Sequence, residues 1–138
     1  MALDLSSLIK AVDSLDKAFK TFRTKGCQAD LDEKNLMRAG VIQNFEFTYE
    51  LCWKYMKRWL ETNMGNSSVD GAPRKELFRI AAESLLIKNT ENWFEYHEAR
   101  NQTAHTYNAN KAEEVYLAAE KFLDDAKDFL GVLSAKND

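Results

Sequence analysis

The sequence predicts an all-α fold, an antiparallel up-and-down bundle of about five helices. Apolar residues recur at alternating steps of three and four over long segments, which is the spacing of one helix face. One proline and five glycines leave few interruptions in 138 residues. No segment shows the strict polar–apolar alternation of a half-buried strand. We expect residues 1–138 to form one domain, because this length suffices for a single hydrophobic core.

Two apolar stripes predict the first two helices. The first stripe consists of Leu5, Leu8, Val12, Leu15, Phe19 and Phe22. It ends before Gly26, a residue type that suits a helix C-terminus. A second helix is expected to begin at Asp30 or Asp32 and to reach about Asn63, with the stripe Ile42, Phe45, Tyr49, Cys52, Met56 and Trp59. Some thirty residues span roughly 45 Å, enough for the spine of the molecule.

Turn and capping residues divide the rest of the chain into a loop and three more helices. Residues 63–71 are rich in Gly, Asn and Ser and are expected to form a loop. Pro73 suits the first turn of a third helix. The apolar residues of that helix are Leu77, Ile80, Ala81 and Leu85. The last two helices are expected to begin at caps, namely Asn89 or Thr90 for the fourth and Asn108 or Asn110 for the fifth. The stripe of the fifth helix is Ala112, Val115, Ala119, Phe122, Ala126, Phe129 and Leu133.

Composition and charge narrow the class of protein. The net charge of −3 provides no broad basic field that would attract nucleic acid. Cys27 and Cys52 are isolated thiols, so a disulfide framework or a zinc site is not expected, and this usage suits a reducing cytoplasm. The first residues lack the pattern of a signal peptide, and no apolar run has the length of a membrane span. We therefore expect a cytoplasmic protein with no metal, no cofactor and no membrane contact.

The second helix carries more apolar surface than one face requires. The additional residues are Val41, Phe47, Leu51, Trp53 and Tyr55. A helix that is apolar on several sides is buried on several sides. Either this helix lies at the centre of its own bundle, or a second copy of the chain covers part of it. The sequence favours neither alternative, so a homodimer is a hypothesis.

The candidate chemistry lies in eight consecutive residues, Arg100-Asn101-Gln102-Thr103-Ala104-His105-Thr106-Tyr107. A planar guanidinium can clamp an anion, an imidazole can move protons near neutral pH, and a phenol can accept a transferred group. On an ideal helix, Arg100 and Tyr107 share a face, whereas His105 lies about 140° away from Arg100 and above Asn101. Arg100 and His105 can therefore share a ligand only through a loosened helix, bent side chains or a subunit boundary. His97 is assigned no role.

Structural roles compete with chemical roles for these residues. Arg100 can be the ion-pair partner of Glu46 or Glu50 on the second helix. These two carboxylates lie one turn apart and repel each other unless a cation sits between them. His105 can be a helix-terminal histidine favoured by the helix dipole, and Tyr107 a half-buried packing residue. Spacing alone does not decide between the two sets of roles.

Several chemistries have no counterpart in the sequence. It contains no glycine-rich phosphate loop, no HExxH, no GxSxG and no carboxylate set typical of magnesium-dependent transfer. The glycine-containing loop near Gly65 is not followed by paired aspartates. We therefore do not expect this chain to be a nucleotidyltransferase by itself.

Two sequence blocks resemble a known family. The pattern Arg100-Asn101-xx-Ala104-His105-x-Tyr107 resembles the RNxxxH signature of HEPN proteins, with the added tyrosine of HepT-type members. Residues 41–54, VIQNFEFTYELCWK, resemble the second helix of the nucleotidyltransferase substrate-binding protein family. The resemblance runs over nearly the whole chain and includes the all-helical plan.

This resemblance implies a helical bundle that dimerises and binds a separate minimal nucleotidyltransferase, as the HEPN component of a toxin–antitoxin-like pair. For HepT-type members it also implies a metal-independent ribonuclease toxin, which the partner neutralises by adding AMP to a tyrosine. Carried over by residue, Arg100 and His105 are the catalytic pair. Asn101 is a support, and Tyr107 is the AMP acceptor. Glu46 and Glu50 are support candidates beside the arginine.

Two hypotheses from different classes follow. In the first, the chain is a binding subunit that holds a nucleotide or an acceptor substrate for the partner enzyme. In the alternative, it is a ribonuclease in which His105 acts as general base or acid on a 2′-hydroxyl of RNA. Arg100 would then stabilise the charge that develops on the phosphate. We prefer the first hypothesis, because two separate blocks indicate the same family.

Overall fold

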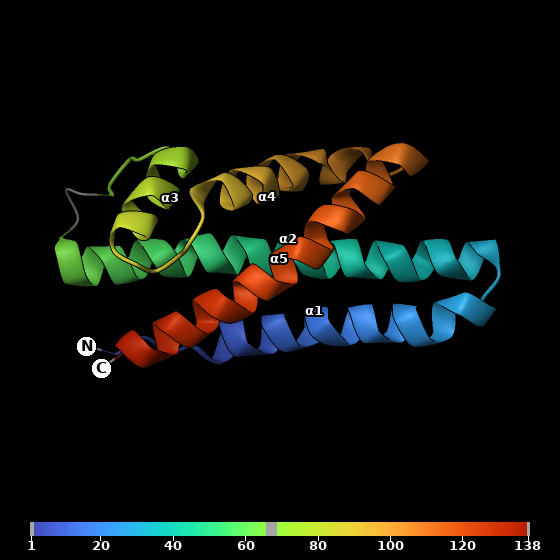
Figure 1. Ribbon diagram of the computed structural model, residues 1–138, viewed down its shortest axis with the longest axis horizontal. Helices are drawn as coiled ribbons and strands as arrows, with labels where there is room; N and C mark the ends of the chain where they lie inside the picture. Colours follow the sequence, from blue (N-terminus) through green and yellow to red (C-terminus); the bar gives the residue numbers. More distant parts are fainter. Residues whose placement is uncertain (1, 66–68, 138) are drawn as a thin grey trace.

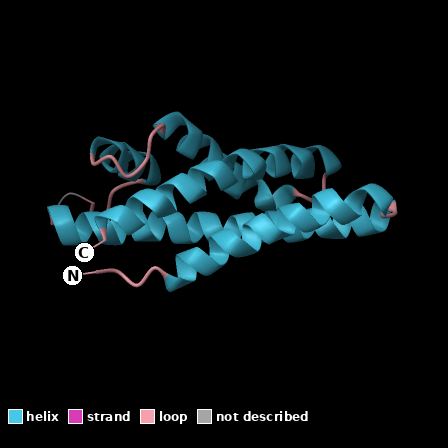
Figure 2. Cartoon of the chain, turned by 60° about the horizontal axis from the view of Figure 1, so that its bottom comes forward, coloured by secondary structure: helices cyan, strands magenta, loops and turns pink. Residues whose placement is uncertain are grey.

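The computed structural model describes residues 2–65 and 69–137, and within them the chain is helical with no strand (Figures 1 and 2). Its elements are α1 (Ser6–Lys25), η1 (Gly26–Gln28), α2 (Leu31–Met64), α3 (Arg74–Glu83), α4 (Thr90–Gln102), η3 (Thr103–His105) and α5 (Ala109–Lys136). The five α-helices confirm the predicted fold class. Residues 66–68 of the predicted loop lie outside the described residues.

The long helix α2 is the spine of the bundle, as predicted. It has 34 residues, a length of roughly 50 Å. It packs against α1, α3, α4 and α5 (Figure 1). Asp30 begins the helix, because its side chain accepts a hydrogen bond from the backbone N–H of Glu33 at 2.8 Å. The end of the helix matches the expectation as well, since Gly65 follows it with a positive φ of 88°.

An aromatic cluster joins α2, α4 and α5 at the centre of the core. The ring of Phe122 lies edge-on to four other rings, with centroid distances of 5.2 Å to Phe45, 6.3 Å to Tyr49, 5.6 Å to Trp93 and 5.2 Å to Tyr96. All five side chains are at most 1% exposed. Edge-to-face contacts of this kind add specific geometry to apolar burial. The cluster therefore fixes where α4 lies along α2.

The additional apolar residues of α2 are mostly covered by its own chain. Val41 and Tyr55 are buried, and Leu51 and Trp53 are half-buried against the core. The central position of α2 thus accounts for most of its apolar surface. Phe47 is the exception, because 56% of its surface remains exposed.

The prediction for the third helix was wrong at both ends. Pro73 caps the helix from outside instead of lying in its first turn. At the other end, α3 stops at Glu83, and Leu85 lies beyond it with a φ of 63°. The backbone N–H of Leu86 donates to the carbonyl of Ala81 at 2.9 Å. This bond reverses the chain direction after α3 without a glycine.

The predicted caps of the last two helices are present. Asn89 accepts hydrogen bonds from the backbone N–H groups of Glu91 and Asn92, which starts α4. Asn108 caps α5 in the same way, because its side chain accepts hydrogen bonds from the backbone N–H groups of Asn110 and Lys111. Across residues 2–65 and 69–137, we find no helix with the length and apolar content that a bilayer crossing requires.

Candidate functional site

The motif of residues 100–107 spans the connection between α4 and α5. The α-helix ends at Gln102, and a tighter 3-10 turn covers Thr103–His105. The hydroxyl of Thr103 donates to the carbonyl of Arg100 at 2.8 Å, and the hydroxyl of Thr106 donates to the carbonyl of Thr103 at 3.1 Å. Such side-chain bonds to the backbone compete with helical hydrogen bonds. The ideal-helix geometry, in which Arg100 and Tyr107 share a face, therefore does not apply, and the helix is loosened within the motif, which was one of the alternatives that the sequence allowed.

The guanidinium of Arg100 is held against α2. Its Nε donates to a carboxylate oxygen of Glu50 at 3.2 Å, and its Nη1 lies 3.8 Å from a carboxylate oxygen of Glu46. Nη1 also donates to the hydroxyl of Thr103 at 3.1 Å. All three charged side chains are about one-third exposed. The structural alternative for Arg100, an ion pair with both glutamates, is the arrangement in this chain.

The charge balance around Arg100 is negative. One guanidinium faces two carboxylates, so the three groups together carry one net negative charge. An incoming phosphate would have to replace a glutamate or approach the outer edge of the guanidinium, since the described contacts use Nε and Nη1. Arg100 is thus oriented for an anion, and the anion competes with Glu46 and Glu50 for it.

His105 and Tyr107 lie together at the surface. Their ring centroids are 6.3 Å apart in an edge-on arrangement. Tyr107 is 87% exposed, so it is not the half-buried packing residue that the sequence also allowed. Asn101, four residues before His105, is also exposed. In the described part of the chain, no hydrogen bond or ion pair joins Arg100 to His105, whereas the imidazole and the phenol are neighbours.

A groove runs beside Tyr107, between the first turns of α2 and α5. Its volume is about 520 Å³. It is lined by Leu31, Asn35, Arg38, Ala39, Ile42, Thr106, Tyr107, Ala109 and Ala112. Arg38 is the cation of this groove, and it pairs with Glu113 at 3.4 Å. The lining of the groove is mostly apolar and includes Tyr107.

A second polar network, missed by the sequence analysis, lies next to Arg100. The carboxylate of Glu50 that holds Arg100 also accepts a hydrogen bond from the indole N–H of Trp53 at 3.0 Å. The guanidinium of Arg74 stacks on the same indole, 3.3 Å from the ring centroid. The Nε of Arg74 is buried and has no hydrogen-bond partner among the described residues. The contact between Glu50 and Trp53 could be predicted from their spacing of three residues on one helix. The contact with Arg74 could not, because Arg74 lies on another helix.

His97 belongs to this network. Its Nδ1 is 2.8 Å from the hydroxyl of Tyr49. Burial and the positive charge of Arg74 lower the pKa of His97, against smaller opposing effects of Glu98 and Glu50. A neutral imidazole can accept the hydrogen bond from the Tyr49 hydroxyl. Burial also raises the pKa of Tyr49, which keeps its hydroxyl protonated as the donor.

Comparison with known proteins gives a consistent assignment of family. A family model described as nucleotidyltransferase substrate binding protein like matches residues 3–135. A Haemophilus influenzae protein named "Probable ribonuclease HepT" is 40% identical to this chain over 100 residues. That alignment covers 72% of this chain and 68% of the relative.

Solved structures share the fold. A Haemophilus influenzae structure, described as revealing the fold of a substrate binding domain of a nucleotidyltransferase, superposes with a TM-score of 0.90 at 31% identity. The match covers 95% of this chain and 99% of that one. A Thermus thermophilus structure superposes with a TM-score of 0.74 at 26% identity, over 91% of this chain and 98% of that one.

The network predicts how His97 contributes to the pH dependence of stability. The folded-state pKa of His97 lies below the value of 6.5 for a free histidine, so the unfolded chain binds a proton first as the pH falls. The contribution of neutral His97 is complete above about pH 6.5 and is lost below it. Urea unfolding between pH 7.5 and pH 5 is expected to show a flatter decline in the free energy of unfolding for His97→Gln than for the wild type. Equal slopes over this range would contradict the prediction.

Proposed function

Since the chain belongs to the nucleotidyltransferase substrate binding protein like family, we propose that it is the helical binding subunit of a separate minimal nucleotidyltransferase. In this role it presents the connection between α4 and α5 to the active site of the partner. The pair corresponds to a toxin–antitoxin-like module in which this chain is the HEPN component.

The exposure of Tyr107 carries this proposal. Large aromatic side chains are usually buried or packed, yet this phenol is 87% exposed on a turn. A second polypeptide can therefore reach its hydroxyl without unfolding either helix. The neighbouring groove of about 520 Å³ gives a nucleotide space to lie beside the hydroxyl.

In the proposed reaction, Tyr107 is the AMP acceptor. Its hydroxyl oxygen attacks the α-phosphorus of ATP, which the partner enzyme supplies with its metal ions. The new bond joins the tyrosine oxygen to the α-phosphorus, pyrophosphate leaves, and the phenolic proton is released. His105 is a neighbouring base, with its ring centroid 6.3 Å from that of Tyr107, and it can accept that proton directly or through water.

A second function, a metal-independent ribonuclease, is favoured by the relative named "Probable ribonuclease HepT". His105 would take the proton of a 2′-hydroxyl, and the resulting oxyanion would attack the adjacent phosphorus. Arg100 would exchange Glu50 for a phosphate oxygen and stabilise the charge that develops there. AMP on Tyr107 would then block access to His105, which connects the two functions.

The proposed assembly is a homodimer formed through an apolar face of α2. Leu36 and Phe47 are 75% and 56% exposed. They are eleven positions apart, which is about three helical turns and places both on the same side. The residues between them on this side are Gly40 and Gln43, neither of which carries a charge. Dimerisation here would cover the apolar surface that the bundle itself leaves exposed.

Phe47→Glu tests the dimer. A carboxylate at this position would be desolvated in the interface without a partner, so the dimer is expected to dissociate. Light scattering over a concentration series should give the dimer mass for the wild type and the monomer mass for the variant. Leu117→Glu is the matched control, because Leu117 is an exposed leucine on α5. A wild type that remains monomeric at high micromolar concentration contradicts the proposal.

Tyr107→Phe tests the acceptor. Incubation of the wild type with the partner enzyme and ATP is expected to add the mass of AMP to the intact chain, and the phenylalanine variant should gain none. Tyr116→Phe serves as the control, because Tyr116 is half-buried on α5 and should leave the modification intact. Adenylation of the Tyr107→Phe protein, or none of the wild type, would refute the acceptor role.

His105→Ala tests the ribonuclease. Loss of a general base that acts on the 2′-hydroxyl is expected to lower RNA cleavage by about a hundredfold or more. Arg100→Ala should reduce it by a similar factor through lost charge stabilisation. The measurement is single-turnover cleavage of a labelled RNA, with His97→Gln as a control outside the motif. Cleavage that persists in His105→Ala, or no cleavage by the wild type, eliminates this second function.

A further inference from the structure

The connection between α3 and α4 contains a leucine in a conformation that favours glycine. Leu85 has a φ of 63° and is the one non-glycine residue with positive φ among the described residues. Its N–H donates to the carbonyl of Ala82 at 3.0 Å, and the next N–H donates to the carbonyl of Ala81 at 2.9 Å. This pattern of bonds closes many helices, and the residue at this position is usually glycine because it has no Cβ to clash.

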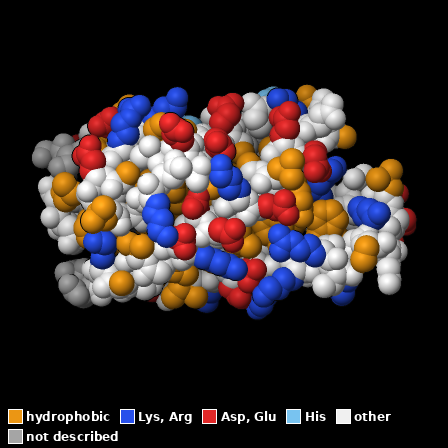
Figure 3. Space-filling model, in the orientation of Figure 1, with side chains coloured by type: hydrophobic (Ala, Val, Ile, Leu, Met, Phe, Trp, Pro, Cys, Tyr) orange, Lys and Arg blue, Asp and Glu red, His pale blue; other side chains and the backbone are white. Residues whose placement is uncertain are grey.

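The fold itself gives no reason for a leucine at this position. Leu85 is 73% exposed, so it contributes little to the core. A glycine would remove the backbone strain and also the exposed apolar surface. Backbone strain and exposed apolar groups that persist together are typical of interaction sites. Hydrophobic side chains lie at the surface over this connection in Figure 3.

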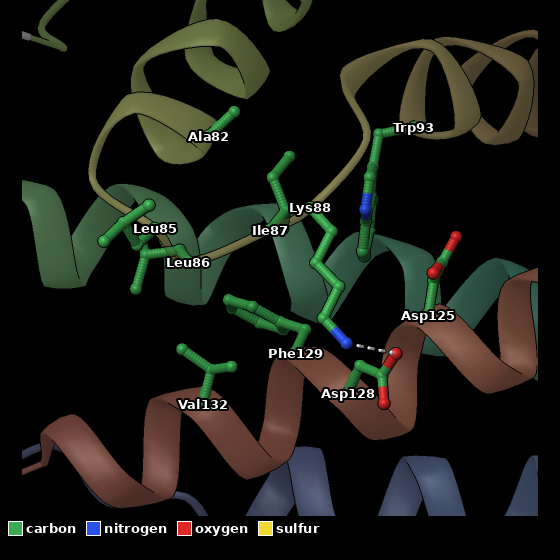
Figure 4. Close-up of a pocket in the computed structure, with 10 residues that line it drawn as sticks. All are labelled: Ala82, Leu85, Leu86, Ile87, Lys88, Trp93, Asp125, Asp128, Phe129 and Val132. Carbon is green, nitrogen blue, oxygen red and sulfur yellow. Dashed lines mark hydrogen bonds and ion pairs between the residues drawn. The ribbon is translucent and has the colours of Figure 1, made fainter.

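Leu85 stands at the edge of a pocket of about 410 Å³. The pocket lies between the α3–α4 connection and the C-terminal half of α5 (Figure 4). Its apolar lining comes from four elements of the chain: Ala82, Leu85, Leu86, Ile87, Trp93, Phe129 and Val132. A pocket of this size and composition accepts one large apolar side chain together with its neighbours.

The polar rim of this pocket is acidic. Asp125 and Asp128 lie on one side, and Lys88 reaches across to Asp128 at 3.4 Å (Figure 4). Asp125 is fixed, because the Tyr96 hydroxyl and the Asn92 side-chain amide both donate to it. The Lys88–Asp128 pair is 76% and 54% exposed and is therefore weak. An incoming cation can replace Lys88 at Asp128.

We propose that this pocket and Leu85 form the docking surface for the nucleotidyltransferase subunit, an inference that rests on the proposed function. The contacting segment of that subunit carries a large apolar residue that fills the pocket. Beside it lies a lysine or arginine that pairs with Asp128, which matches the acidic rim by charge. α4 has 13 residues, roughly 20 Å. Figure 1 shows that the α3–α4 and α4–α5 connections lie at opposite ends of α4. The partner thus binds at the N-terminal end of α4 and reaches Tyr107, in the connection that follows its C-terminal end.

Two variants of the full-length chain test this docking surface. Leu85→Asn removes the apolar anchor but keeps a residue that tolerates positive φ, and Asp128→Lys reverses the charge at the rim. Titration calorimetry with the purified proposed partner, a separate minimal nucleotidyltransferase, should show the Kd raised about tenfold or more in each variant. Leu117→Asn, an exposed leucine outside the pocket, should bind like the wild type. Urea unfolding checks that each variant is folded.

The other outcomes separate this inference from the proposed function. If the wild type and both variants bind the nucleotidyltransferase equally, the docking surface is refuted and the binding-subunit role stands. If Leu85→Asn instead lowers the self-association of this chain in light scattering, a second copy occupies the pocket and the inference is overturned. If the wild type does not bind the nucleotidyltransferase at all, the proposed function fails and this docking surface fails with it.

Discussion

The rest of the structure depends on one constraint, that α2 must be buried on several sides along its length. Four helices cover it, and each does so with an apolar stripe of its own. Thr48 shows how tight this packing is, because its buried hydroxyl donates to the carbonyls of Asn44 at 2.8 Å and Ala11 at 3.2 Å. Glu46 and Glu50 of α2 are only partly buried, and Arg100 of α4 pairs with both.

Much of this architecture could be predicted from the sequence, because helix stripes and caps are local signals. Asp30, Asn89 and Asn108 each cap a helix through their own side chain, and all three positions were expected. The misplaced features arise from competing local bonds or from tertiary contacts. Thr103 ends α4 by bonding to the backbone, a role that its residue type permits but does not require. Leu85 takes a conformation that its residue type argues against.

The candidate site was predicted in part. The pairing of Arg100 with glutamates of α2 could be anticipated, because one cation between two carboxylates relieves their repulsion. The network around Arg74, Trp53 and His97 could not, since three helices contribute to it: Arg74 of α3 stacks on Trp53 of α2, and His97 of α4 bonds to Tyr49 of α2. The site roles of Arg100, Asn101, His105 and Tyr107 remain proposals.

The ion pairs of Arg100 are compatible with a role in anion binding. The ion pairs of Arg100 join side chains that are about one-third exposed, and each such pair contributes about 1 kcal/mol or less of stabilising free energy. A phosphate oxygen that accepts a charge-assisted bond from the same guanidinium makes an interaction at least as strong. In the free chain, the carboxylates and Thr103 keep the guanidinium in one orientation, which reduces the entropy lost when an anion binds.

The outer face of α4 favours a protein partner over RNA along this side of the bundle. α4 buries Trp93, Tyr96 and Ala99 and exposes Glu91, Glu95 and Glu98. Lys121 neutralises Glu95 at 3.0 Å, and the other two glutamates have no cation within ion-pair distance among the described residues. Exposed carboxylates repel RNA phosphates, whereas they attract a basic protein surface and align it during encounter. In the proposed complex, the charge of α4 would guide a basic partner along the helix that separates the pocket with the acidic rim from Tyr107.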